Sequence, residues 1–268
     1  MGVARRARLD AELVRRGLAR SRVQAADLIA AGQVLVAGLA AVKAATQIGQ
    51  DAPITVLQPD DEPGYVSRGG RKLAGALAAF GGLAVRGRRC LDAGASTGGF
   101  TDVLLRAGAA HVVAADVGYG QLAWSLRSDP RVTVLDRVNV RGLEPGQVAP
   151  QPDLVTADLS FISLVQVLPA LVRCARQDAD FVLLVKPQFE VGKGKVGAGG
   201  VVRDPQLRAG AVAAVAEAAR QLGLGVRGVT ASPLPGPAGN VEYFLWLRRG
   251  AEPLDAAELD AAVSGGPQ

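Results

Sequence analysis

The chain has 268 residues, of which 49% are hydrophobic and 21% are charged, so its composition is that of a folded globular protein. Lysine and arginine exceed aspartate and glutamate by 30 to 25, which permits a nucleic-acid partner without requiring one. Two cysteines and one histidine argue against a disulfide framework and against a zinc site, and we expect no metal. No uncharged apolar run is long enough to span a membrane, and the first residues lack the apolar region of a signal peptide. We therefore expect a cytoplasmic protein with no membrane partner.

A small basic module is predicted over residues 1–59. RLDAELVRRG and SRVQAADLIAAGQ have the apolar spacing of two short helices, and VLVAG and PITVL are typical of short strands. Arginines gather around the junction of the two helices, where guanidinium groups can bind phosphates. A solvated, charged helix pair is the plainer alternative. The candidate RNA-binding side chains of this module are Arg5, Arg6, Arg15, Arg16, Arg20 and Arg22.

Residues 60–70, within a polar stretch rich in Pro and Gly, are predicted to be a linker. From residue 71 to 250, helical and strand-like patterns alternate. This alternation predicts an α/β fold with a mostly parallel, doubly wound sheet covered on both faces. The last two strands, GVRGVTASP and NVEYFLWLRR, are close enough to form a hairpin, so the final strand is expected to be antiparallel. Residues 251–268 are predicted to be a tail in which only DAAELDAAV has a helical pattern.

The turn LDAGASTGGF follows the first strand of the predicted sheet and precedes a helix, which is where open α/β sheets bind ligands. Its glycines allow a tight turn and close backbone approach. Asp116 ends the next strand, where a carboxylate can accept hydrogen bonds from ribose hydroxyls. The candidate cofactor-binding residues are Asp92, Gly94, Ser96, Gly98, Gly99, Phe100, Asp116, Asp136 and Asp158.

The sequence of this turn differs from the motifs of other ligand-binding loops. It is neither the G-x-G-x-x-G of dinucleotide sites nor the G-x-x-x-x-G-K-[ST] of a P-loop. GASTG matches the serine-hydrolase elbow, but the only histidine, His111, is badly placed to act with Ser96. A nucleoside ligand without a pyrophosphate favours S-adenosylmethionine. The alternative is a purely structural strand-turn-helix.

Four charged residues stand at the ends of apolar elements: Lys72, Asp158, Lys186 and Glu242. In a doubly wound sheet, Asp158 and Lys186 would project at the same edge as the glycine turn, and an antiparallel last strand would begin there with Glu242. Each residue alone has a solvated strand or helix end as its simpler interpretation. Together, in the order Lys, Asp, Lys, Glu, they resemble the catalytic tetrad of FtsJ-like RNA ribose 2′-O-methyltransferases.

The tetrad resemblance implies a role for each of its members. A ribose 2′-hydroxyl is a weak acid, and we expect Lys186 to be its general base. Asp158 and Lys72 would orient the reacting groups, with Glu242 in support. Methylation of an exocyclic amine or of cytosine C5 fits less well, because DLSF stands where [DN]-P-P-[FY] is expected and neither Cys90 nor Cys174 is suitably placed.

The motifs extend this resemblance to most of the chain. LVRRGLARSRVQAADLIAAGQVLVAG resembles an S4 RNA-binding domain, and LDAGASTGGF with HVVAADVGYGQL resembles class I methyltransferases. With VSRGGRKL, ADLSFISL, VKPQFEVGKG and SPLPGPAGNVEYF, the whole is similar to the TlyA family. That resemblance implies an S-adenosylmethionine-dependent enzyme that methylates the ribose 2′-hydroxyl of cytidine in 16S and 23S ribosomal RNA. It also implies ribosomal subunits as partners and an effect on capreomycin and viomycin susceptibility. The sequence does not give the oligomeric state, and a monomer is favoured.

The glycine-rich loop EVGKGKVGAGGVVRD offers Lys193 and Lys195 as further RNA contacts, with a plain flexible connection as the alternative. Phe100 and Phe189 are expected either to stack on a base or to pack in the core, and Trp124 and Trp246 to lie in the core. Two other functions stay open: a membrane-active hemolysin, and an RNA-binding chaperone with a vestigial methyltransferase fold.

Overall fold

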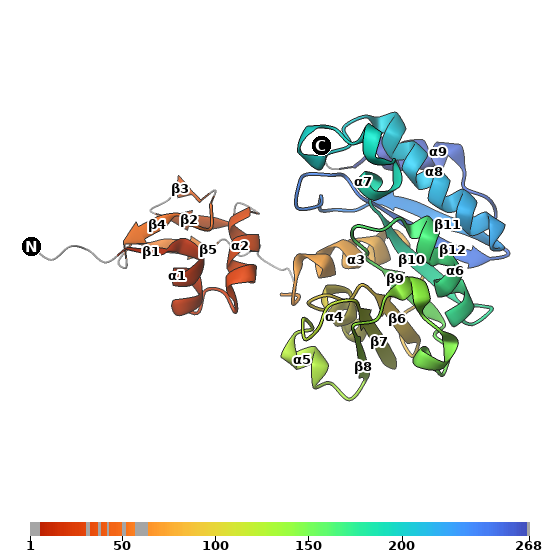
Figure 1. Ribbon diagram of the computed structural model, residues 1–268, viewed down its shortest axis with the longest axis horizontal. Coiled ribbons are helices and arrows are strands. Elements are labelled where there is room, and N and C mark those ends of the chain that lie inside the picture. The colour runs from red at the N-terminus through yellow and green to blue at the C-terminus, as the bar shows by residue number, and fades with distance from the viewer. Residues whose placement is uncertain are drawn as a thin grey trace, which may run out of the picture. The chain divides into compact units, whose positions relative to one another are not determined.

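The computed structural model describes residues 6–30, 33–36, 39–41, 43–49, 52–56 and 64–266. The chain divides into two compact units, Met1–Gly64 and Tyr65–Gln268 (Figure 1). Arg5 and residues 60–63 of the predicted linker lie outside the described residues. Residues 68–70, also assigned to the linker, instead form the first turn of a helix, so that helix begins three residues earlier than predicted.

The first unit contains both of the helices predicted for it, together with short strands. They are β1 (Arg6–Arg8), α1 (Leu9–Arg15), α2 (Arg22–Ala30), β2 (Val34–Val36), β3 (Leu39–Ala40), β4 (Gln47–Gly49) and β5 (Ile54–Val56). β1 pairs with β4, while β3, β2 and β5 form a second antiparallel sheet. Leu9, Leu13, Ala25, Ile29 and Val34 form its small core. The amphipathic spacing of the two helices thus buries one face of each.

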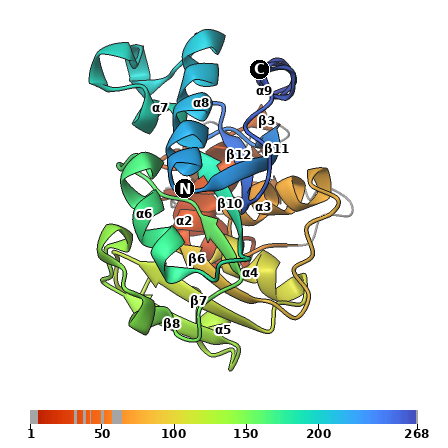
Figure 2. The ribbon, with the colours of Figure 1, turned by 90° about the vertical axis from the view of Figure 1, so that its right-hand side faces the viewer.

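A seven-stranded sheet with the order β11-β12-β10-β9-β6-β7-β8 organises the second unit (Figure 2). Its strands are β6 (Arg89–Ala93), β7 (His111–Asp116), β8 (Val132–Asp136), β9 (Leu154–Ala157), β10 (Asp180–Val185), β11 (Leu224–Ala231) and β12 (Tyr243–Arg249). β12 is antiparallel to β10 and β11, and the β6, β7, β8, β9 and β10 pairings are parallel. The predicted α/β fold with an antiparallel last strand is confirmed.

Helices cover both faces of this sheet, and every residue of β10 is buried as a result. The helices are α3 (Arg68–Ala79), α4 (Gly99–Arg106), α5 (Trp124–Arg127), α6 (Leu164–Cys174), α7 (Pro187–Glu190), α8 (Pro205–Gln221) and α9 (Ala256–Ser264). One core packs side chains of α3 and α4 against the sheet, and the other packs α6 and α8. The helix predicted in DAAELDAAV is confirmed as α9, which Asp255 caps and whose Leu259 is buried.

The two tryptophans have opposite environments. Trp246 lies in the core, where its Nε1 donates to Asp180 at 2.7 Å. Trp124, also expected in the core, is 79% exposed, so that prediction was wrong. The reason is that α5 has only four residues and buries Leu126 alone. Within the described ranges, every helix is too short or too polar to cross a membrane.

Candidate active site

The glycine turn joins β6 to α4 at the carboxyl edge of the sheet. Gly94 has a φ of +85°, and a Cβ placed on it would come within 2.5 Å of the Asp158 carbonyl oxygen at the end of β9. Gly98 has a φ of +99° immediately before α4. Only glycine satisfies both the backbone conformation and the close approach at residue 94. The turn therefore packs closely against the end of the neighbouring strand β9.

Asp92, predicted to contact the cofactor, lines neither of the two cavities described below. Its side chain is fully buried, and its Oδ2 accepts a hydrogen bond from Thr101 Oγ1 at 2.7 Å. Because side chains alternate along a strand, Asp92 points to the α4 face of the sheet. It ties β6 to α4 behind the turn. Burial raises the pKa of the Asp92 carboxyl from 3.8 to about 7.

This raised pKa has a consequence for stability. The folded protein binds the Asp92 proton between about pH 4 and pH 7, where the unfolded chain has released it. This residue therefore contributes stability below pH 4 that is lost as the pH rises to 7, by up to about 1.4 kcal/mol per pH unit. Asp92→Asn should flatten that decline. Urea denaturation at several pH values tests this, and an identical pH dependence in the variant would contradict it.

A cavity of about 420 Å³ lies beside the turn, with Asp116 and Gln121 on its polar side and Val117, Val138 and Val140 among its apolar lining. The Asp116 carboxylate accepts hydrogen bonds from the backbone N–H of Ser96 at 2.8 Å and of Gly118 at 2.7 Å. Two loops thus hold Asp116 at the rim of the cavity, facing the turn. Gln121 was not singled out from the sequence.

The structure places the other two candidate cofactor residues differently. Asp136 lines neither of the two cavities described here, since its carboxylate accepts a hydrogen bond from the Arg127 guanidinium at 2.7 Å, which holds its pKa below the usual value. Phe100 is only 3% exposed, and its ring packs against Phe244 with 5.9 Å between the centroids. Phe100 is mainly a core residue, although it lines the end of the smaller cavity.

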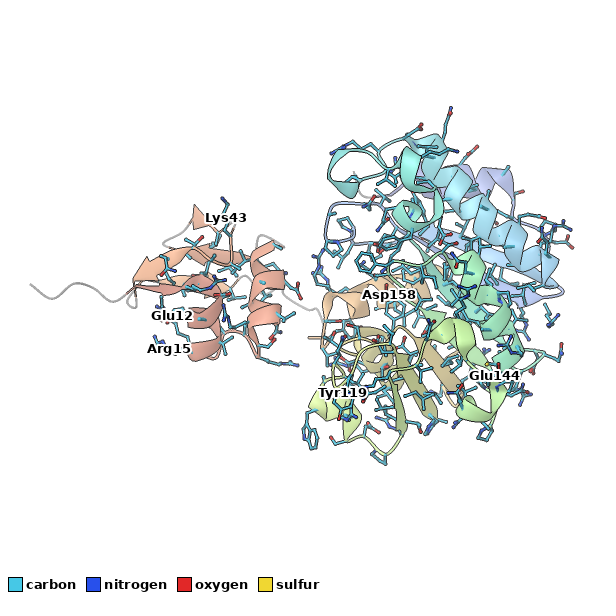
Figure 3. All side chains as sticks on the ribbon, in the orientation of Figure 1. Glu12, Arg15, Lys43, Tyr119, Glu144 and Asp158 are labelled. Carbon is cyan, nitrogen blue, oxygen red and sulfur yellow. The ribbon has the colours of Figure 1, made fainter. Side chains whose placement is uncertain are left out.

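A smaller cavity, of about 190 Å³, contains the side chain of Lys186. Lys186 Nζ lies 2.5 Å from Asp158 Oδ1 and donates to Ser160 Oγ at 3.1 Å. Gly94, Ser96, Asp158 and Ser160 line both cavities, so the two cavities lie next to each other. Asp158, labelled in Figure 3, directly follows β9. Ser160 was missed from the sequence because a serine in a loop carries no distinctive signal.

Lys72 and Glu242 form a second ion pair next to the first. Their Nζ and Oε2 atoms are 2.5 Å apart, and the two residues are 6% and 1% exposed. The β10–β12 register pairs Val185 with Tyr243, so the next positions along the two strands are Lys186 and Glu242. The structure therefore brings the four predicted residues together, as two ion pairs. Neither Lys72 nor Glu242 lines the two cavities. Seen from the cavities, their ion pair therefore lies behind the pair of Lys186 and Asp158.

The arginines of the first unit are more engaged than the basic-face prediction assumed. Arg15 and Arg16 pair with the buried Glu12, while Arg22 pairs with Asp10 (Figure 3 shows Glu12 and Arg15 on α1). The Arg15 and Arg16 guanidinium groups hold the pKa of Glu12 at about 2. Arg15, Arg16 and Arg22 consequently stabilise the first unit, and they also contribute to its positive charge.

The remaining RNA-binding candidates differ in how they are placed. Arg20 is exposed, and no described side chain pairs with its guanidinium. Lys195 is also exposed, in a short 3-10 turn at Lys193–Lys195. The side chains of Arg6 and Lys193 lie outside the described set.

A mostly parallel sheet with one antiparallel strand and a glycine turn at its carboxyl edge defines the Rossmann-like methyltransferase class. Matches to two family models and to relatives over nearly the whole chain, given next, show that the chain belongs to the TlyA family of FtsJ-like methyltransferases. The FtsJ-like methyltransferase model matches residues 65–249, and the S4 domain model matches residues 7–49. Both resemblances read from the motifs are confirmed, and the protein is an enzyme of the methyltransferase class.

Relatives support this placement over nearly the full length. The chain is 68% identical to the 16S/23S rRNA (cytidine-2′-O)-methyltransferase TlyA of Mycobacterium tuberculosis over 97% of each protein. It is 41% identical to YqxC of Bacillus subtilis over 96% of this chain and 90% of that protein. A solved structure of a Streptococcus thermophilus protein that carries the name hemolysin is 36% identical, with a TM-score of 0.77, over 98% of this chain and 96% of that one.

Proposed function

We propose that this protein transfers the methyl group of S-adenosylmethionine to the ribose 2′-hydroxyl of cytidine in 16S and 23S ribosomal RNA. The observation that carries the proposal is the adjacency of two cavities, one at the glycine turn and one at Lys186 and Asp158, which share four lining residues. The 68% identity to an enzyme named for this reaction supports it.

The larger cavity suits S-adenosylmethionine. Asp116 would accept hydrogen bonds from the ribose hydroxyls, and the apolar surface around Val117 and Val138 would contact the adenine. Gly94 lets the backbone of the turn approach the amino-acid part of the cofactor. When bound, the cofactor supplies an electrophilic methyl group on a sulfonium.

The smaller cavity suits the 2′-hydroxyl. Lys186 is held by Asp158 and Ser160, so in its neutral form its amine would have a defined position from which to receive the hydroxyl proton. The Asp158 carboxylate then stabilises the resulting ammonium. Lys72 and Glu242, buried and paired, fix the strand ends on which this geometry depends.

The S4 domain supports a ribosomal RNA substrate, because exposed arginine on a small basic unit binds phosphates in any sequence context. We propose ribosomal subunits as the physical partners, with the protein acting as a monomer in the cytoplasm. We also propose that its modification increases susceptibility to capreomycin and viomycin. Hemolysin activity has no support beyond the wording of a name. A chaperone with a vestigial site would not bind the cofactor.

Two arginines of the first unit should respond differently to substitution. Arg20→Ala should weaken RNA binding and lower the slope of log affinity against log salt by about 1, without changing amide hydrogen exchange in α1 and α2. Arg16→Ala should speed that exchange, because Arg16 pairs with the buried Glu12 and donates to Ala52 O at 2.8 Å. An unchanged salt slope for Arg20→Ala would remove it from the RNA interface.

Incubation of purified ribosomal subunits with the protein and methyl-labelled S-adenosylmethionine tests the proposed function. Label in 16S and 23S RNA is the expected result. Label in protein only, or none despite cofactor binding, would contradict an RNA acceptor.

A further inference from the structure

Two short segments carry the groups around Lys186. The first is α7, which begins directly after Lys186 and ends at Glu190. The second is the loop 158–163, which begins with Asp158 after β9 and ends with Ser163 before α6. The contacts of Lys186 with Asp158 and Ser160 therefore depend on how this loop is held against α7.

Glu190 joins the far ends of the two segments. Its Oε2 accepts a hydrogen bond from Ser163 Oγ at 2.5 Å, and its Oε1 accepts one from the backbone N–H of Leu164 at 2.8 Å. Ser163 Oγ in turn accepts from the N–H of Val165 and caps α6. Glu190 has no cationic partner in the part of the chain that the structure describes, and burial raises its pKa. Because Glu190 is half-buried without a cation, the hydrogen bonds from Ser163 and Leu164 compensate for the water that its carboxylate loses.

The loop has few other supports. Its near end is tied to the sheet by the hydrogen bond from Asp158 N to Ala93 O, at 3.0 Å. Residues 159–162 make no backbone–backbone hydrogen bond within the described ranges. Phe161 has a φ of +64°, in the left-handed region that residues with a side chain rarely adopt, and it is 91% exposed. The Phe161 and Phe189 rings, with centroids 5.3 Å apart, form a second contact between loop and α7.

We propose that Glu190 is a positioning residue for methyl transfer. It anchors the loop 158–163 to α7, so that Asp158 and Ser160 meet the Lys186 amine in one geometry. This inference rests on the proposed function of Lys186. It assigns to Glu190 no contact with substrate or cofactor.

Single-turnover methyl transfer to ribosomal RNA, at saturating S-adenosylmethionine, is the test. Glu190→Ala should slow the transfer roughly tenfold, with cofactor and RNA affinities within about twofold of the wild type. Glu190→Gln should recover most of the rate, because its amide oxygen can accept from Leu164 and its amide N–H can donate to Ser163 Oγ. Should Glu190→Ala fail to fold, Ser163→Ala carries the test, with a smaller loss expected. Asp204→Ala is the matched control, since it removes the side-chain cap of α8 elsewhere and should leave the rate unchanged.

A double-variant comparison separates positioning from general stability. Adding Glu190→Ala to Ser160→Ala should slow transfer less than Glu190→Ala does alone, because part of what Glu190 positions is already absent. Equal losses in both backgrounds, or a wild-type rate for Glu190→Ala, would overturn the proposal. A wild-type rate in Lys186→Ala would instead overturn the role of Lys186 as general base, and absence of label in RNA with the wild-type protein would overturn the proposed function. Loss of activity in Lys186→Ala beside a normal Glu190→Ala would reject the positioning role alone.

Discussion

Replacement of Lys186 by alanine should reduce the rate of methyl transfer by roughly 10²–10⁴-fold, the contribution typical of a positioned general base. The variant removes the amine that Asp158 and Ser160 hold in the smaller cavity. RNA affinity should stay near that of the wild type, because the arginines of the first unit are untouched. Single-turnover rates and RNA binding measured on the same preparation check both parts.

Lys186→Arg provides the matched control for charge. A guanidinium retains the pairing with Asp158 but does not give up its proton near neutral pH. We therefore expect Lys186→Arg to be nearly as slow as Lys186→Ala. An arginine variant that restored the rate would show that Lys186 acts through its positive charge alone.

The second large effect is on stability. Glu242→Leu should lower the free energy of unfolding by about 3–5 kcal/mol, because it leaves the Lys72 ammonium buried without its partner. The double variant Lys72→Met with Glu242→Leu should recover much of this loss, since two apolar side chains then replace the pair. Both tryptophans lie in the second unit, so their fluorescence during urea denaturation reports on that unit.

The rate of methyl transfer shows whether Lys72 and Glu242 serve catalysis or only the stability of the fold. The double variant should remain slow even where its stability returns, because the tetrad is incomplete. A stable double variant with the wild-type rate would show that Lys72 and Glu242 serve the fold only. A Glu242→Leu variant as stable as the wild type would contradict the assignment of a tight buried pair.

The sheet could be predicted from the sequence because both of its signals are local. Fully apolar runs such as FVLLV mark strands covered on both faces, and helices with one apolar stripe alternate with them. The carboxyl-edge rule then places Asp158 and Lys186 beside the glycine turn. Lys72 and Glu242 are 170 residues apart, and their direct pairing could not be predicted, because it depends on side-chain geometry at the end of a register.

The predictions that differ from the structure have one physical cause. The burial and direction of a side chain depend on its tertiary neighbours, which the local sequence does not specify. Trp124 looked like a core residue, but α5 is too short to bury it. Asp92 looked like a ligand contact, but strand alternation turns it away from the cavity. Arg15, Arg16 and Arg22, predicted to bind RNA, also pair with buried carboxylates of the same unit, which the sequence did not indicate.

The central claim is that the methyl group is placed on a ribose oxygen of cytidine, and one measurement addresses it directly. Ribosomal RNA labelled by the wild-type protein would be cleaved with alkali, and the resistant dinucleotides sequenced, with Lys186→Ala-treated RNA as the blank. Resistant linkages that follow cytidines in 16S and 23S RNA, absent from the blank, are the predicted result. Label on a base, with every linkage still cleaved by alkali, would contradict ribose 2′-O-methylation.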